Sequence, residues 1–191
     1  MEQGVILAGF GGQGLLFAGH VLARAALAEG RAVSWMPSYG PEMRGGTASC
    51  TVIVADRPIG SPIVDRAAAA VVLTPPALAR FEPMLVPGGL LVVNETLIEA
   101  LPTRTDIEVL GLPCTALARE AGDDRLVSVV ALGGLLARRP IVERASVRDA
   151  LAELLGPSRF EVLAADLAAL DAGIERGLVG GLASPAAVPA K

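Results

Sequence analysis

A glycine-rich turn near the start of the chain has the spacing of a phosphate-binding motif. Residues 9–14 read Gly-Phe-Gly-Gly-Gln-Gly and fit the pattern G-x-G-x-x-G, between two apolar runs. Glycines let the backbone approach a phosphate closely, and the amino terminus of the following helix offers free N–H donors and partial positive charge. The alternative is that the glycines only permit a tight strand-to-helix turn, but their density favours phosphate or pyrophosphate binding. The candidate ligand-binding residues of this turn are Gly9, Gly11, Gly12, Gln13 and Gly14.

An NAD site needs a further residue that this sequence lacks. Such a site expects an acidic residue at the end of the second strand, about twenty residues after the glycines, to hold the ribose hydroxyls. Residues 35–38 read Trp-Met-Pro-Ser at that place, Glu29 comes before the strand, and Glu42 lies deep in the next loop. The sequence therefore disfavours NAD binding by this chain alone.

Several other catalytic chemistries are excluded by residue types. The chain's one lysine is Lys191, so the glycine turn lacks the lysine of a Walker-type loop and no Schiff base is expected. The one histidine, His20, lies inside the predicted first helix and is interpreted as a helix-surface residue. The two cysteines, Cys50 and Cys114, lie far apart and form neither a metal-ligand pattern nor a disulfide framework. We expect no metal site, and we interpret Cys50 as a small core residue.

A second stretch, residues 38–50 (SYGPEMRGGTASC), also carries ligand-binding potential. It contains the chain's only tyrosine and an arginine, Arg44, that is followed by two glycines. An arginine in that setting can present its planar guanidinium to a carboxylate or phosphate without crowding. The alternative is a solvated loop with a surface arginine. The candidate residues of this stretch are Ser38, Tyr39, Gly40, Arg44, Gly45, Gly46 and Thr47.

Apolar periodicity indicates the elements that must position these two motifs. The first strand, the helix after it and the second strand are expected to form a right-handed, parallel βαβ unit. The loop after the second strand then opens at the same sheet edge as the glycine turn, which is where ligands bind in such folds. The third strand alternates apolar and polar residues, so one of its faces is expected to be buried. Strands are predicted over residues 4–8, 31–36, 47–55, 68–73, 89–93 and 106–110, and helices over residues 13–29, 76–84, 115–121, 126–138, 146–155 and 159–176.

This order of elements predicts an α/β fold. We expect three layers, with a mostly parallel Rossmann-like sheet, helices on both faces and a helical C-terminal part. Residues 1–180 are expected to form a single domain, and residues 181–191 a disordered tail.

Composition and charge limit the classes of binding partner and the cellular compartment that we expect for this chain. A net charge of −4 and a pI near 5.1 argue against a nucleic-acid surface. The uncharged segment 4–23 is long enough to span a membrane, but its glycines, Gln13 and His20 interrupt it. We therefore expect a cytoplasmic protein that binds neither nucleic acid nor membrane. Its 52% content of hydrophobic residues suggests that some apolar surface is buried between subunits.

Together the two motifs resemble the gamma subunits of the 2-oxoacid:ferredoxin oxidoreductases, the pyruvate/ketoisovalerate oxidoreductase catalytic domain family. The combination of GGQG and YGPEMRGG at this separation is specific, and the likeness continues through residues 86–94 (VPGGLLVVN), 111–120 (GLPCTALARE) and 131–136 (ALGGLL). There is one departure. Similar chains often carry asparagine and methionine before the last of these segments, where this chain has Val-Ser-Val-Val with Ser128.

The resemblance implies a subunit of an enzyme complex that is not active alone. Such a complex oxidatively decarboxylates a 2-oxoacid, transfers the acyl group to coenzyme A and passes two electrons to ferredoxin. Thiamine diphosphate, magnesium (Mg) and iron–sulfur clusters would lie on partner subunits, namely alpha and beta and, in some complexes, a ferredoxin-like delta. This chain would cradle coenzyme A with the two motifs and close the active site, with no catalytic residue assigned to it.

The substrate and two other classes of function stay open at this point. The YGPE-type loop resembles that of the 2-oxoglutarate and branched-chain 2-oxoacid members. We take 2-oxoglutarate first, although the residues do not separate the two. The alternatives are a stand-alone NAD- or flavin-dependent oxidoreductase and a non-catalytic nucleotide-binding module.

Overall fold

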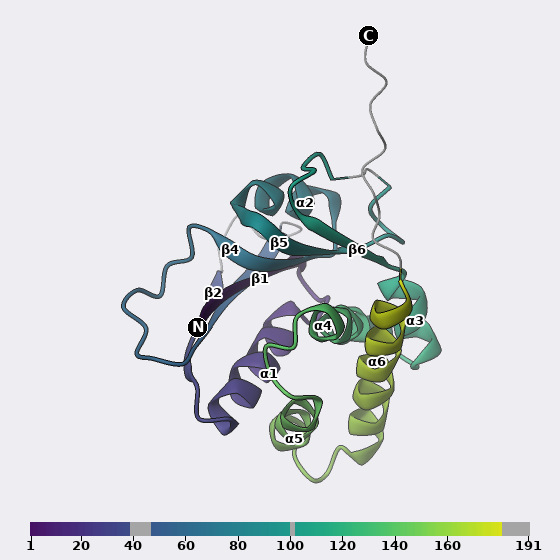
Figure 1. Ribbon diagram of the computed structural model, residues 1–191. Coiled ribbons are helices and arrows are strands. Elements are labelled where there is room, and N and C mark those ends of the chain that lie inside the picture. The colour runs from purple at the N-terminus through teal and green to yellow at the C-terminus, as the bar shows by residue number, and fades with distance from the viewer. Residues whose placement is uncertain (39–46, 100–101, 181–191) are drawn as a thin grey trace.

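The fold is built on one mixed sheet, seen in a computed structural model that describes residues 1–38, 47–99 and 102–180 (Figure 1). Among these residues six strands are ordered β2-β3-β1-β4-β5-β6 across the sheet. The strands are β1 (Glu2–Phe10), β2 (Ala32–Ser38), β3 (Thr47–Ala55), β4 (Ala67–Val72), β5 (Leu85–Asn94) and β6 (Glu108–Leu112).

The helices follow the predicted order, and their ends differ from the prediction by a few residues. The described part of the chain contains α1 (Leu15–Ala28), α2 (Pro75–Phe81), α3 (Cys114–Glu120), α4 (Val127–Arg138), α5 (Arg144–Leu155) and α6 (Phe160–Val179), and the short 3-10 helices η2 (Glu82–Met84) and η3 (Asp124–Leu126). α1 buries an apolar stripe against the sheet: Leu15, Ala18, Leu22 and Ala26 are each at most 2% exposed.

One strand runs against the others. β4 pairs with β1, β5 with β4 and β6 with β5 in parallel, whereas β3 is antiparallel to both β1 and β2. β2 therefore has the direction of β1, as expected for a βαβ unit, but it is not the neighbour of β1. The chain turns back after β2 and places β3 between the two strands. The sheet is still mostly parallel.

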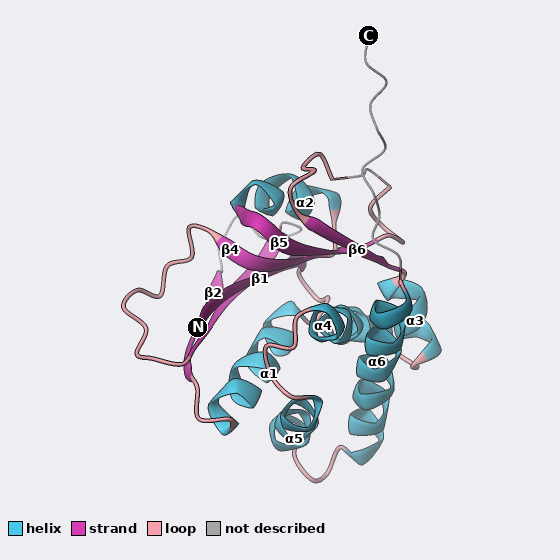
Figure 2. Cartoon of the chain, in the orientation of Figure 1, coloured by secondary structure: helices cyan, strands magenta, loops and turns pink. Residues whose placement is uncertain are grey.

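Helices cover both faces of the sheet, but unequally. Figure 2 shows α2 on one face of the sheet and α1, α3, α4, α5 and α6 on the opposite face. Residues of β1 alternate between the two cores: Val5 and Leu7 belong to the larger one, and Ile6 and Ala8 to the smaller one beneath α2. The predicted three-layer α/β arrangement is confirmed.

The polar face of β3 is more buried than its alternation suggests. Cys50 faces the larger core as expected, but Ser49 on the other face is only 6% exposed and Ile53 is 3% exposed. β3 is an inner strand, and Ile63 and Val64 of the following loop approach Ile53. The prediction that only one face of this strand is buried was therefore wrong.

Helix α4 is fixed at the centre of the larger core. Its residues from Val127 to Leu136 are all buried. It packs on α6 so closely that Gly133 meets the backbone of Leu170, and Gly173 meets the backbone of Val130. This packing holds the amino terminus of α4 in a defined position.

Candidate functional site

The glycine turn joins the carboxyl end of β1 to the amino end of α1. The backbone N–H of Phe10 donates to Oε1 of Gln13 at 2.7 Å, and the backbone N–H of Gln13 donates to the carbonyl of Phe10 at 3.4 Å. The side chain of Gln13 therefore braces the turn from inside.

Two positions in the turn require glycine. Gly12 and Gly14 have φ angles of +91° and +77°, a conformation that other residues adopt only with strain. Gly14 is also the N-cap of α1. Within the described residues, a Cβ on Gly11 or Gly12 would meet no atom within 4 Å, so the outer side of the turn is open.

The partial positive charge at the amino terminus of α1 is not compensated by an acidic residue in its first turn. No side chain of the described residues caps it, and its first turn begins with Leu15, Leu16 and Phe17. The first N–H groups of a helix have no intrahelical partner, and this end of the helix carries partial positive charge. An open turn with free donors is suited to a phosphate group.

The ends of the second motif lie at the same edge of the sheet. Thr47, the first residue of β3, is the register partner of Phe10, and Ser38, the last residue of β2, is the partner of Ser49. The segment between them therefore begins and ends at this edge of the sheet, and it ends directly beside the glycine turn. The remaining candidates of this motif lie outside the described residues, namely Tyr39, Gly40, Arg44, Gly45 and Gly46.

The inserted strand weakens the NAD alternative further. Because β3 separates β2 from β1, the end of β2 lies two strand spacings, about 10 Å, from the glycine turn. An acidic residue at the end of β2 would be about twice as far from a bound ribose as in a sheet where the two strands are neighbours. The residue found at this position is Ser38.

Three buried polar residues near this edge carry oxygen atoms without a partner among the described residues. Thr74 is the residue at the N-cap position of α2 but makes no side-chain cap hydrogen bond, Asn94 ends β5, and Ser128 lies in the first turn of α4. All three side chains are fully buried, and the unpartnered atoms are Oγ1, Oδ1 and Oγ respectively. Asn94 does donate through Nδ2 to Oγ1 of Thr115 at 3.0 Å. Sequence reasoning missed Thr74 and Asn94, and it noticed Ser128 only as a departure from similar chains.

The amino end of α4 touches the glycine turn. A Cβ placed on Gly14 would lie 2.7 Å from Oγ of Ser128 and 2.9 Å from the carbonyl oxygen of Arg125. Two carboxyl groups on the elements next to this contact have shifted pKa values, Asp123 just before η3 and Asp166 of α6. The guanidinium of Arg125 holds the pKa of Asp123 at about 2, whereas burial raises the pKa of Asp166 to about 6, with a further contribution from Asp123.

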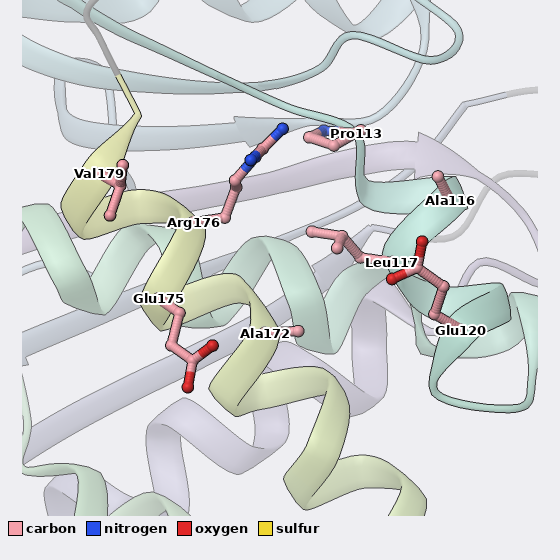
Figure 3. Close-up of a pocket in the computed structure, with 8 residues that line it drawn as sticks. All are labelled: Pro113, Ala116, Leu117, Glu120, Ala172, Glu175, Arg176 and Val179. Atoms are coloured by element: carbon pink, nitrogen blue, oxygen red, sulfur yellow. The ribbon is translucent and has the colours of Figure 1, made fainter.

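A separate groove of about 500 Å³ runs between α3 and α6 (Figure 3). In Figure 3 the side chain of Arg176 points toward Pro113, and that of Glu175 points away from it. None of the residues that line this groove belongs to the glycine turn. They are Pro113, Ala116, Leu117, Glu120, Ala172, Glu175, Arg176 and Val179.

The cysteines and the histidine are not arranged for catalysis. Burial raises the pKa of the Cys50 thiol to about 12, and it also raises the pKa of Cys114. His20 is half-buried on α1 and stacks on Trp35 with ring centroids 5.0 Å apart.

Within the described ranges, no group of three or more His, Cys, Asp or Glu side chains is placed to hold a metal ion. No helix in the described part of the chain is both long and apolar enough to cross a membrane.

Fold and site together define a class: a Rossmann-like α/β domain with an open glycine turn at the carboxyl edge of its sheet. The chain belongs to the pyruvate ferredoxin/flavodoxin oxidoreductase family, whose sequence profile matches residues 4–176.

Related sequences agree with this assignment. The chain is 37% identical over 175 residues to the ketoisovalerate oxidoreductase subunit VorA of Methanothermobacter thermautotrophicus, a match that covers 91% of this chain and 36% of VorA. It is 34% identical over 155 residues to the 2-oxoglutarate synthase subunit KorC of Methanocaldococcus jannaschii, covering 79% of this chain and 82% of KorC. The chain thus spans about a third of VorA but most of KorC.

Two solved structures superpose on this chain. The gamma subunit of a keto/oxoacid ferredoxin oxidoreductase from Geobacter sulfurreducens superposes with a TM-score of 0.79 at 28% identity, over 93% of this chain and 99% of that one. The 2-oxoglutarate:ferredoxin oxidoreductase of Magnetococcus marinus superposes with a TM-score of 0.85, over 96% of this chain and 32% of that one. Its identity is 22%, so this likeness concerns the fold alone.

Proposed function

We propose that the chain is a gamma-type subunit of a 2-oxoacid:ferredoxin oxidoreductase. The complex would oxidatively decarboxylate a 2-oxoacid to an acyl-coenzyme A and reduce ferredoxin. Family membership supports this role, as do relatives named as subunits of 2-oxoglutarate synthase and ketoisovalerate oxidoreductase.

Within that complex the chain would bind coenzyme A at the glycine turn. The observation that carries this proposal is the open outer side of Gly11 and Gly12, next to the uncapped start of α1. Coenzyme A contains a pyrophosphate, and backbone N–H groups at a helix amino terminus bind such anions. The Magnetococcus marinus structure is described with coenzyme A and succinyl-CoA bound, which is compatible with this proposal.

The chain's own contribution would be positioning and enclosure. Backbone donors of residues 11–17 would hold the pyrophosphate and so fix where the thiol end can reach. The second motif begins and ends at the same sheet edge, so Arg44 would face a phosphate or a substrate carboxylate there. The domain would also close over the active site and exclude water from it.

The redox cofactors would lie on the partner subunits. A four-cysteine iron–sulfur cluster needs twice the two cysteines that the chain contains, and both are buried. The donor set of this chain therefore does not fit a cluster. Thiamine diphosphate, magnesium and the clusters would belong to alpha, beta and, where present, delta subunits, with ferredoxin as the electron acceptor.

The substrate we favour is 2-oxoglutarate. KorC of Methanothermobacter thermautotrophicus matches the chain over 95% of its own length at 32% identity, so it is a relative of similar extent. A branched-chain 2-oxoacid is the second candidate, because two VorA relatives are 37% and 35% identical to the chain.

Native purification tests the assignment to a complex. We expect thiamine- and cluster-binding chains to co-purify with this chain, and the purified mixture to reduce a viologen dye with a 2-oxoacid and coenzyme A. The separated chain should be colourless and inactive. Flavin or cluster absorbance in the chain alone, or NAD-dependent turnover by it, would support the alternatives instead.

The coenzyme A site has its own test. Gly11→Val fills the open side of the turn without a positive-φ penalty, so in the assembled enzyme the KM for coenzyme A should rise while the KM for the 2-oxoacid stays unchanged. Gly60→Val is the matched control, because Gly60 also has open space around it and lies in the loop after β3. An unchanged coenzyme A dependence in a folded Gly11→Val enzyme would reject the cradle.

A further inference from the structure

The groove between α3 and α6 is lined by matching faces of the two helices. From α3 and its N-cap the lining residues are Pro113, Ala116, Leu117 and Glu120, and from α6 they are Ala172, Glu175, Arg176 and Val179. Both sets have the spacing i, i+3, i+4, i+7, which places them along one side of each helix. In Figure 3 Pro113 and Val179 lie at one end of the groove and Glu120 and Ala172 at the other, so the helices run in opposite directions along it.

The apolar lining of this groove is accessible from outside. Ala116 is exposed, Leu117 is half-buried, and Val179 is 82% exposed. At the end marked by Val179 the groove adjoins a hollow of about 290 Å³, which shares Arg176 and Val179 with it. Leu178, next to Val179 in the chain, is 65% exposed. Exposed apolar side chains gathered on one face are typical of a surface that another molecule covers.

The charged side chains of this face are mostly acidic. Glu120 and Glu175 line the groove and Glu95 lines the adjoining hollow, against the single guanidinium of Arg176. None of these groups forms an ion pair with another described residue. Glu120 also ends α3, where a negative charge opposes the helix dipole, so it does not stabilise its own helix. An occupant that carries positive charges beside an apolar stripe would be complementary to this face.

An α-helix is the element whose shape fits here. Two helices that lie side by side leave a furrow between their ridges, and a third helix packs into such a furrow through apolar residues three and four positions apart. A second copy of this chain in a two-fold contact would present the same concave face, and two hollows do not fill each other. The partner must therefore present a convex element. VorA extends well beyond the region that this chain matches, so in that relative the domain is joined to further polypeptide.

From the shape and charge of this face we infer that the groove between α3 and α6 binds an amphipathic helix of a partner subunit, with lysine or arginine residues beside its apolar stripe. The inference rests on the proposed role in an oxidoreductase complex, and it names the surface and the kind of element that would hold the chain there. None of the lining residues belongs to the glycine turn, so this contact would leave the turn open to coenzyme A.

A single introduced thiol tests whether the groove is covered in the complex. Both native cysteines are buried, so Ala116→Cys places one reactive thiol in the groove. Ala152→Cys is the matched control, since Ala152 is also an exposed helical alanine but lies on α5, outside the groove. Both thiols should react rapidly with dithionitrobenzoate in the separated chain. After assembly with the thiamine- and cluster-binding chains from native purification, the thiol of Ala116→Cys should be protected and that of Ala152→Cys should still react.

A photo-cross-linker on the same thiol identifies the occupant. Benzophenone maleimide attached to Ala116→Cys should, on irradiation of the complex, join this chain to a partner subunit. Mass spectrometry should locate the cross-link in a stretch with apolar residues at helical spacing and lysine or arginine beside them. A cross-link to a second copy of this chain, to residues 181–191 of the chain itself, or to a stretch without helical periodicity would reject the inference.

The acidic residues provide a test that does not depend on labelling. The double variant Glu120→Gln and Glu175→Gln should raise the dissociation constant of the complex by about tenfold, the effect of losing two ion pairs. The matched control is Glu143→Gln with Glu161→Gln, because these two residues are also exposed glutamates and neither lines the groove. Sedimentation velocity over a dilution series measures both double variants.

The outcomes separate this inference from the proposed function. If native purification yields no thiamine- and cluster-binding chains, the proposed function fails and this inference fails with it. If the complex forms but the thiol of Ala116→Cys still reacts in it, or the Glu120 and Glu175 double variant assembles with an unchanged dissociation constant, the complex stands and the groove is not its contact. If the control double variant weakens assembly as much, a general loss of negative charge explains the result and the inference is again rejected.

Discussion

The Oγ of Ser128 lies 2.7 Å from the point that a Cβ on Gly14 would occupy. The carbonyl oxygen of Arg125 lies 2.9 Å from that same point. Position 14 therefore requires glycine on two grounds. Its φ is +77°, and there is no room for a methyl group.

We expect Gly14→Ala to lower the free energy of unfolding by about 2–4 kcal/mol, from left-handed backbone strain and overpacking together. Gly11→Ala is the matched change in the same turn, and it should alter stability by less than about 0.5 kcal/mol because space is open there. Urea unfolding followed by circular dichroism measures both. Equal stabilities for the two variants would contradict the described packing of α4 on the turn.

Much of this architecture can be predicted from local sequence. Apolar runs and glycine residues locate every described strand and α-helix to within a few residues, because periodicity records which side of an element is buried. The glycine turn was likewise visible, since a strand before it and a helix after it are local features. The family resemblance depends on the same local segments.

The position of β3 could not be predicted in this way. Nothing in the alternation of residues 47–55 tells whether this strand lies at the sheet edge or between β1 and β2, and the buried Ser49 follows from that placement. The contact of Ser128 with Gly14 joins residues 114 positions apart in the sequence. It depends on how α4 packs between the sheet and α6, which no local pattern encodes.

The two thiols should be unreactive in the folded chain. Cys50 is 1% exposed and Cys114 fully buried, and burial raises the pKa of both, so thiolate is scarce at neutral pH. We expect no reaction of the native chain with a thiol reagent such as dithionitrobenzoate, and two equivalents after unfolding in guanidinium. The Cys50→Ala variant assigns the remaining equivalent to Cys114. Rapid labelling of the native chain would show that one of the two is accessible.

Asp166 should make stability depend on pH. Burial and the nearby Asp123 raise its pKa to about 6 in the folded chain, whereas an unfolded aspartate has a pKa of about 3.9. The folded state therefore binds this proton more tightly, and the stabilisation is full below about pH 4 and lost as pH rises through about 6. The difference corresponds to roughly 3 kcal/mol.

The Asp166→Asn variant removes the buried charge and tests this account. Its free energy of unfolding should exceed that of the unmodified chain by up to about 3 kcal/mol near pH 8, and the gain should vanish near pH 4. Urea unfolding at both pH values measures it, and Glu161→Gln on the exposed side of α6 controls for the loss of one negative charge. A gain of the same size at both pH values would rule out titration of Asp166 as its cause.

The carboxyl end of α6 should contact a partner subunit if the chain acts in a complex. Leu178 and Val179 are 65% and 82% exposed, and Val179 also lines the groove between α3 and α6 (Figure 3). Covering an apolar side chain of this size contributes about 1.5–3 kcal/mol. The double variant Leu178→Asp and Val179→Asp should therefore elute as a separated chain on size-exclusion chromatography, where the unmodified chain elutes with its partners.

Leu27→Asp is the control for this prediction, because Leu27 is 49% exposed and lies at the other end of the fold, on α1, and this variant should still assemble. Both variants should unfold at the same urea concentration as the unmodified chain, because neither site is in the core. Normal assembly of the double variant would place the partner contact on another face.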